Sequence, residues 1–237
     1  MDETTDRKSP RPSKVIFDLN IAVIGEPATG KTAIISRLSG GTFPPFYKPT
    51  NGVEQSVATI EIEEGVEANI CFWDVSGHER FGTTSRSYCN KCTGFIFVFD
   101  CTRDLTLSSL LHWNMDVNAN AGNNIYEEVM EGDISKILIA NKKDLVKPSQ
   151  NNLKQEADMS SFSETCGIIE SFGCSAKTGL GLDRAIHTLA KKMIENLRRK
   201  GVTGRVKTPQ KKHKAEKPKP KPQQELGPAP VFNSWRF

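Results

Sequence analysis

Apolar segments of strand length alternate with helical patterns along most of the chain. Six segments predict strands, over residues 19–24, 52–62, 68–75, 94–100, 136–140 and 168–173. Apolar positions three and four residues apart predict helices from residue 33 onward and over residues 104–121, 153–166 and 180–199. Strands that alternate with helices are typical of a mostly parallel sheet covered on both faces. The pattern therefore predicts an α/β fold with a six-stranded, mostly parallel sheet and helices on both sides.

Two of the predicted helices have a distinct apolar side. In the helix over residues 104–121, the buried face is expected to hold Leu107, Leu110, Leu111 and Met115. The last helix has a longer stripe, formed by Leu182, Ile186, Leu189, Met193 and Leu197. Each stripe predicts a helix that packs along the sheet.

The two ends of the chain lack this apolar pattern. The net charge is +4, but residues 198–237 hold twelve Lys or Arg and two Glu, which gives that segment +10. Its alternating Lys and Pro over residues 217–222 favour an extended chain, and its low apolar content favours disorder. We therefore expect a domain over residues 15–199, between a polar extension (1–14) and a basic disordered tail (200–237).

Several classes of protein are excluded by composition. No apolar stretch approaches the ~20 residues that cross a bilayer, and the polar N-terminus has no signal-peptide core. The six cysteines show no disulfide spacing, and Cys89 and Cys92 form a C-x-x-C with no second pair to complete a zinc site. The sequence thus predicts a cytoplasmic protein with reduced thiols.

A glycine-bounded loop follows the first predicted strand. Residues 25–32, Gly-Glu-Pro-Ala-Thr-Gly-Lys-Thr, fit the phosphate-binding pattern G-x-x-x-x-G-K-[ST] and open a helix. In that geometry, backbone N–H groups face an anion, Lys31 reaches the β- and γ-phosphates and the Thr32 hydroxyl binds Mg²⁺. The residues expected to bind the nucleotide here are Gly25, Ala28, Thr29, Gly30, Lys31 and Thr32. The alternative is a strand-to-helix turn that carries Lys-Thr by chance.

A second motif ends the strand over residues 68–75. Asp74, in Asp-Val-Ser-Gly, is placed to hold Mg²⁺, and the Gly77 N–H can meet a γ-phosphate oxygen. The alternative is that Asp-x-x-Gly forms an ordinary turn.

Two further motifs each follow a strand and indicate the base. The Asp144 carboxylate, in Asn141-Lys142-Lys143-Asp144, can accept from N1–H and the amine of guanine, whereas adenine would leave it unsatisfied. Asn141 would brace the loop and the Lys142 stem would lie against the base. In Ser175-Ala176-Lys177, the Ala176 N–H can donate to guanine O6. Together these motifs predict binding of GTP and GDP with Mg²⁺.

These motifs, in this order, resemble those of small GTPases of the Ras superfamily, and specifically the Rab type. The resemblance covers residues 17–197 and implies a P-loop NTPase G domain that hydrolyses GTP and acts as a switch in vesicle or organelle trafficking. Residues 47–54 are similar to Rab switch I, which makes Thr50 a sensor of Mg²⁺ and γ-phosphate. Residues 73–81 are similar to switch II, with Lys31 and Gly77 sensing the γ-phosphate. Segments 80–82, 97–100 and 138–142 resemble the Rab branch that serves lysosome-related organelles.

The resemblance also implies partners. Effectors, exchange factors and GTPase-activating proteins would contact the two switches, at a surface that includes Thr50, Trp73 and Tyr88. Gln55 and Asn51 depart from the family pattern in switch I, which leaves the choice of effector open.

Two departures bear on catalysis. His78 stands where the family has the glutamine that orients the attacking water, and imidazole differs from an amide in shape and in its ability to gain a proton. Pro27 lacks an N–H and so removes one potential phosphate donor. We expect slow hydrolysis with His78 as the catalytic group; alternatively, His78 is a surface residue of switch II.

A last departure concerns the C-terminus. No cysteine follows Cys174, so a prenyl anchor is not expected. The tail could instead bind an acidic protein surface or assembly, or remain solvated. The rival function is therefore a GTPase-fold interaction module with little turnover, docked through its tail on a cytoskeletal or ciliary assembly. Peripheral attachment to an organelle membrane also stays open. An ATP-using P-loop enzyme is disfavoured by Asp144 and Ala176.

Overall fold

The computed structural model describes residues 14–78, 88–121, 134–146 and 153–207. In chain order, the elements of these residues are β1 (Lys14–Ile24), α1 (Lys31–Leu38), β2 (Val53–Glu63), β3 (Val66–Val75), β4 (Gly94–Asp100), α3 (Leu105–Ser108), α4 (Leu110–Asn120), β5 (Ser135–Asn141), α5 (Leu153–Cys166), β6 (Ser171–Gly173), α6 (Leu182–Arg199) and β7 (Arg205–Lys207). A short 3₁₀ turn, Lys143–Leu145, follows β5. Of the described helices, none is long and apolar enough to cross a membrane.

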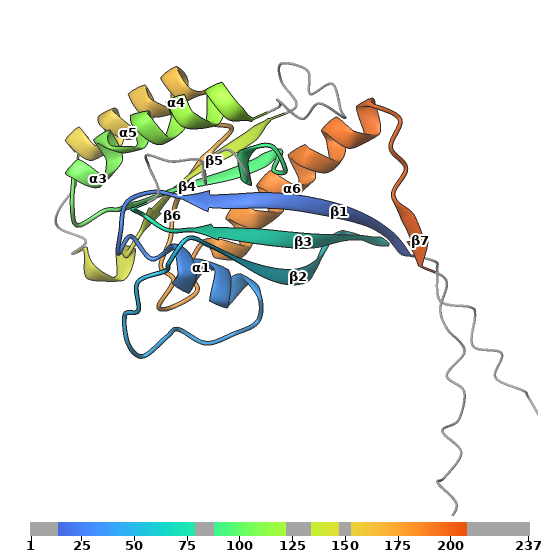
Figure 1. Cartoon of the computed structure of the whole chain (residues 1–237), viewed down its shortest axis with the longest axis horizontal. Helices are drawn as coiled ribbons and strands as arrows, with labels where there is room; N and C mark the ends of the chain where they lie inside the picture. Colours follow the sequence, from blue (N-terminus) through green and yellow to red (C-terminus); the bar gives the residue numbers. More distant parts are fainter. Residues whose placement is uncertain (1–13, 79–87, 122–133, 147–152, 208–237) are drawn as a thin grey trace, which may run out of the picture.

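The strands form one mixed sheet in the order β2-β3-β1-β4-β5-β6, with β7 paired to β1 (Figure 1). Pairs β1–β3, β1–β4, β4–β5 and β5–β6 are parallel, whereas β2–β3 is an antiparallel hairpin. The predicted α/β fold with a mostly parallel sheet is confirmed. The prediction of six strands is corrected to seven for the described residues, since β7 also joins the sheet.

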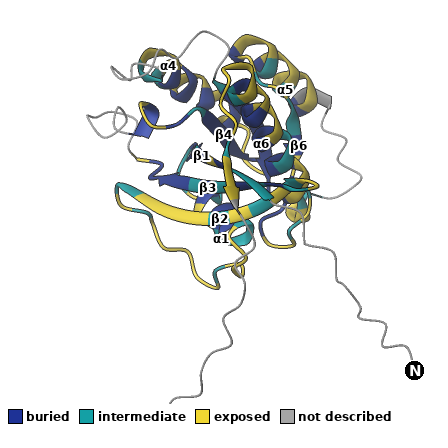
Figure 2. Cartoon of the chain, turned by 90° about the vertical axis from the view of Figure 1, so that its right-hand side faces the viewer, coloured by how far each residue is buried: buried dark blue, intermediate teal, exposed yellow. Residues whose placement is uncertain are grey.

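Helices cover both faces of the sheet, and each face has its own apolar core. Alternate residues of β1 point to opposite faces: Ile21 and Val23 pack with α1 and α6, while Ala22 and Ile24 pack with α4 and α5. Figure 1 shows α4 and α5 on one side of the sheet and α1 on the other. In Figure 2 the inner strands are largely buried, whereas the edge strand β2 is largely exposed. The sheet is therefore a rigid support for the loops at its edges.

The predicted apolar face of the 104–121 helix is partly wrong. The helix is broken at Ser109 into α3 and α4, and Leu111 and Met115 are 43% and 68% exposed. The buried side of α4 instead carries Leu110, Trp113 and Val117, at intervals of three and four residues. The indole of Trp113 buries more apolar area than the Met115 side chain would, so burial of Trp113 decides which side of α4 faces the sheet.

Regular structure continues beyond the predicted end of the domain at residue 199. After α6, residues 205–207 pair antiparallel with Lys14–Ile16 as β7, and Arg205 Nη2 lies 2.6 Å from Asp18 Oδ1. The predicted start of the disordered tail at residue 200 is therefore too early, because regular structure continues to residue 207. The rest of the predicted tail (208–237), residues 1–13 and the switch II segment 79–87 lie outside the described residues.

Candidate functional site

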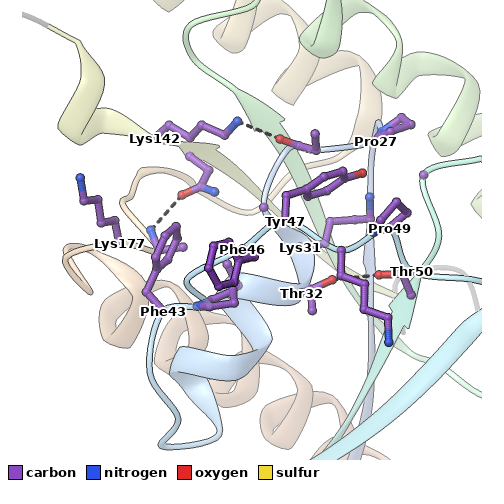
Figure 3. A pocket seen from close by; sticks show the side chains of 18 of the residues that line it. Pro27, Lys31, Thr32, Phe43, Phe46, Tyr47, Pro49, Thr50, Lys142 and Lys177 are labelled. Carbon is purple, nitrogen blue, oxygen red and sulfur yellow. Dashed lines mark hydrogen bonds between the residues drawn. The ribbon is translucent and has the colours of Figure 1, made fainter.

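A cavity of about 510 Å³ opens where β1, β3 and β5 end at the carboxyl edge of the sheet, the usual ligand position in open α/β sheets. Figure 3 shows its walls converging from the glycine loop, the loop before β2 and the loop after β5. It is lined by Pro27, Ala28, Gly30, Lys31, Thr32, Ala33, Phe43, Pro44, Pro45, Phe46, Tyr47, Lys48, Pro49, Thr50, Ser76, Gly77, His78, Asn141, Lys142, Asp144, Leu145, Ala176 and Lys177. The four sequence motifs therefore meet at one cavity.

The two glycines that bound the loop are required by close packing. A Cβ on Gly25 would lie 2.2 Å from the Val98 carbonyl oxygen, and one on Gly30 would lie 2.3 Å from Asn141 Nδ2. Both have positive φ angles, +141° and +97°. Ala28 also has a positive φ, +59°, which a side chain rarely adopts. The loop is thus held in a conformation that its sequence does not favour locally.

Lys31 lies inside the loop. Its side chain donates to the carbonyl oxygens of Gly25 at 2.9 Å and Glu26 at 3.0 Å, and the residue is only 6% exposed. Burial lowers the pKa of Lys31 to about 8, against the opposing attraction of Asp74 and Glu26. The ammonium group is therefore positioned and poorly solvated, so an anionic phosphate would gain more from it than from an exposed lysine.

The three predicted magnesium ligands come together at one end of the cavity. Thr32 Oγ1 donates to Asp74 Oδ2 at 2.6 Å, and Thr50 Oγ1 lies 3.0 Å from Thr32 Oγ1 and 3.4 Å from Asp74 Oδ2. The second oxygen, Asp74 Oδ1, is buried and has no hydrogen-bond partner among the described residues, and burial raises the pKa of Asp74. A hard divalent cation prefers such oxygen ligands and would satisfy the unpaired oxygen. These residues therefore fit Mg²⁺.

The base-reading residues are also assembled. Ser175 Oγ donates to Asp144 Oδ1 at 2.6 Å, which orients the carboxylate at the cavity wall. Asn141 Nδ2 donates to the Thr29 carbonyl at 2.8 Å, as expected of a brace between the two loops. The Ala176 N–H, expected to face guanine O6, instead donates to Asn141 Oδ1 at 3.0 Å, so a guanine contact must share or replace this bond.

Comparison with known proteins decides the family. Residues 20–195 match the Ras family. The chain is 35% identical over 175 residues to Ras-related protein Rab-32B of Dictyostelium discoideum, an alignment that covers 74% of this chain and 64% of the relative. It is 32% identical over 176 residues to Ras-related protein Rab-32A of Dictyostelium discoideum, which covers 74% of this chain and 78% of that relative. It is 30% identical over 177 residues to Ras-related protein Rab-32 of Mus musculus, which covers 74% of this chain and 75% of that relative.

This chain is a Rab-type member of the Ras family. It is thus a small GTPase, a trafficking switch that binds GTP and GDP with Mg²⁺ and hydrolyses GTP. Of the two functions that the sequence left open, the switch is favoured over the interaction module. The family also brings regulators and effectors in general, without identifying them.

The switch II residues of this Rab-type GTPase lie beside the glycine loop. Gly77 is buried, and a Cβ there would lie 2.3 Å from the Pro27 nitrogen, so the two segments are packed tightly. His78 is exposed and lines the cavity, and its backbone N–H donates to Ser76 Oγ at 3.3 Å. The structure therefore places His78, Gly77 and Pro27 on one wall, where the γ-phosphate is expected.

The predicted effector surface is only partly exposed in this GTPase. Trp73 is 8% exposed and its indole N–H donates to Asn20 Oδ1 at 3.2 Å, while Tyr88 is fully buried. Thr50 is half-buried. The expectation that Trp73 and Tyr88 face effectors directly is therefore wrong for the described conformation, because both rings belong to the core between the sheet and α4.

The sequence did not single out the aromatic residues of the loop before β2. Phe43, Phe46 and Tyr47 line the cavity (Figure 3), although Phe46 is 85% exposed and Tyr47 66% exposed. Lys177 also lines the cavity near Phe43. The sequence does contain a signal for these residues, because three aromatic side chains fall within five residues of a Pro-rich loop. Clusters of exposed apolar side chains mark binding surfaces.

The C-x-x-C pair has no part in this site. Cys89 and Cys92 are buried, and burial raises the pKa of the Cys89 thiol to about 12. In the part of the chain that the structure describes, no cluster of three His, Cys, Asp or Glu residues could hold a metal ion.

Proposed function

We propose that this GTPase holds Mg²⁺ through Thr32, Thr50 and Asp74, and reads guanine through Asp144 and Ala176. The observation that carries the metal assignment is Asp74 Oδ1, which is buried beside two threonine hydroxyls and has no partner in the part of the chain that the structure describes. When bound, the cation would neutralise charge on the β- and γ-phosphates. Lys31 and the Gly77 N–H would contact the same phosphates from the glycine loop and switch II.

The switch itself follows from where Thr50 lies. Its loop connects α1 to β2, and its hydroxyl reaches the end of β3 at Asp74 and the start of α1 at Thr32. Contacts with the γ-phosphate and its cation would strengthen this closure, and their loss on hydrolysis would release the loop. The exposed surface of the loop would then change for effectors.

We further propose that hydrolysis is slow. The imidazole of His78 is exposed at the cavity wall instead of the amide that usually orients water. Pro27, whose backbone packs against Gly77, has no N–H to donate. Both features leave the attacking water less well positioned, and a tenfold loss of rate needs only ~1.4 kcal/mol of barrier. The chemistry would be retained, because Lys31 and the Thr32–Asp74 pair are positioned to hold the phosphates and their cation.

Single-turnover hydrolysis of preloaded GTP tests the slow rate. His78→Gln should raise the rate several-fold, and His78→Gln with Pro27→Gly should raise it further. Asp144→Asn would not serve as a control, because it changes nucleotide binding. His187→Gln does, because His187 is a half-buried histidine of α6 whose Nε2 lies 2.8 Å from the Glu61 carbonyl oxygen. A rate that stays flat across both variants would contradict this role for His78 and Pro27.

We also propose that the basic segment after β7 docks this GTPase on an acidic surface, of a protein assembly or of an organelle membrane. Two observations support this: the charge of residues 208–237, which hold seven Lys or Arg against two Glu, and the position of β7 at the start of β1. The glycine loop follows the other end of β1, so β7, after which the segment begins, lies far from the nucleotide site (Figure 1). Docking there would leave both switches accessible.

A further inference from the structure

Three successive carbonyl groups of the glycine loop are each held by a side chain from another segment. Asn141 Nδ2 donates to the Thr29 carbonyl at 2.8 Å, and Lys142 Nζ donates to the Ala28 carbonyl at 2.8 Å. Both belong to the Asn-Lys-x-Asp motif. The preceding carbonyl, that of Pro27, accepts a hydrogen bond from Arg103 Nη2 at 3.1 Å. Arg103 lies in the loop between β4 and α3 and belongs to none of the motifs.

Arg103 and Lys142 share one anchor. Asp100, at the end of β4, lies 2.9 Å from Arg103 Nε and 2.8 Å from Lys142 Nζ, and its side chain is 2% exposed. It also accepts from the Thr102 N–H and hydroxyl. A buried carboxylate with this many donors is fixed in position, so it holds both cations over the loop.

The direction of these bonds decides what they do. A trans peptide group is planar, and its C=O and N–H point in opposite directions. Arg103 does not line the nucleotide cavity, but shares with Pro27 a separate groove on the far side of the loop. Because the Pro27 carbonyl points to Arg103, the Ala28 N–H of the same peptide group points away from Arg103. Pro27 has no N–H of its own, so this donor matters more here than in a loop without proline.

We propose that Arg103 is a positioning residue that aims the Ala28 N–H at the phosphates of the bound nucleotide, as a third clamp beside Asn141 and Lys142. The inference rests on the proposed guanine-nucleotide site. It also accounts for the positive φ of Ala28, a strained conformation that needs support from neighbouring groups.

The test is the rate of GDP release from the full chain, measured with a fluorescent GDP analogue and an excess of GDP. Arg103→Gln should speed release roughly three- to tenfold, as expected for one lost charge-assisted hydrogen bond at a partly exposed site. Arg103→Lys, which keeps a cationic donor, should restore most of the slow release. Arg198→Gln is the matched control, since Arg198 is paired to Glu63 at 2.7 Å, is similarly exposed (47% against 46%) and lies outside the cavity.

A second readout separates positioning from general support of the fold. GMP lacks the distal phosphates, so Arg103→Gln should weaken GDP in competition experiments while leaving GMP unchanged. Unchanged GDP release, an equal loss for GMP and GDP, or a failure of Arg103→Gln to fold would each overturn the inference. If the unsubstituted chain bound no GDP, the proposed function would fail as well, so the two failures are distinguishable.

Discussion

Lys31 shows how burial adjusts a single residue for its task. Its ammonium group is packed against two loop carbonyls, and burial lowers its pKa to about 8. A diphosphate placed beside it would favour the charged form and raise that pKa again. Binding of the diphosphate is therefore coupled to protonation of Lys31 at pH values above about 8, and no proton is taken up well below that pH.

This linkage predicts how affinity depends on pH. Below about pH 8 Lys31 is already charged in the free protein, so the affinity for GDP should be constant there. As the pH rises through about 8, the affinity should fall, because part of the protein must first be protonated. Calorimetric titration between pH 6.5 and about 9 would measure this. GMP shares the base but lacks the distal phosphate, so the ratio of GDP to GMP affinity isolates Lys31; a constant ratio would contradict the account.

For single residues, the sequence predicted those positions that depend only on neighbouring residues along the chain. Gly30, Lys31 and Thr32 line the cavity and Thr32 donates to Asp74, because each motif spans one strand end and the turn after it. Arg103 could not be predicted, since its contact with Pro27 joins segments 76 residues apart. No local pattern encodes such a pairing.

Helix α4 illustrates the same limit at the scale of an element. The pattern of residues 104–121 fits one helix with Leu111 and Met115 inside, but the break at Ser109 shifts the phase. Trp113 then becomes fully buried, and its indole N–H lies 3.4 Å from Glu26 Oε1 beside the glycine loop. Periodicity predicted the helix, whereas its rotation depended on packing against the sheet.

This assignment gives a direct stability test. Trp113→Ala should lower the free energy of unfolding by about 3–5 kcal/mol, because a large buried ring leaves a cavity. Met115→Ala, two residues along the same helix and 68% exposed, should change it by less than about 0.5 kcal/mol. Denaturant unfolding of both variants measures the difference, and equal losses would mean that the predicted face was right after all.

For the whole molecule, the structure places the candidate nucleotide site and strand β7 at opposite ends of β1. Strand β7 pairs with Lys14–Ile16, and Gly204 packs closely on Val15 and Ile16. The sequence predicted the basic segment from its charge but missed β7, because three residues between a glycine and a proline-rich stretch carry too little pattern to predict a strand.

Two truncations separate the proposed docking role of residues 208–237 from the stabilising role of β7. A chain that ends after residue 207 should keep the thermal stability and GDP affinity of the full chain but lose its localisation in cells. A chain that ends after residue 203 should also lose about 1–2 kcal/mol of stability, because it removes the β7 pairing and the Arg205 contact with Asp18. Normal localisation of the longer truncation would contradict the docking role. Equal stability of the two would contradict the role of β7.

The central claim is that this GTPase reads guanine through Asp144, which Ser175 holds at the cavity wall. Its most direct test is competition of GDP, xanthosine diphosphate and ADP for the purified full chain and for Asp144→Asn. The account predicts that GDP binds the unsubstituted chain far more tightly than ADP, and that Asp144→Asn weakens GDP and strengthens xanthosine diphosphate. An amide can donate to the carbonyl that xanthine presents, but cannot accept both guanine donors. Unchanged GDP affinity in Asp144→Asn, or equal binding of ADP and GDP, would contradict it.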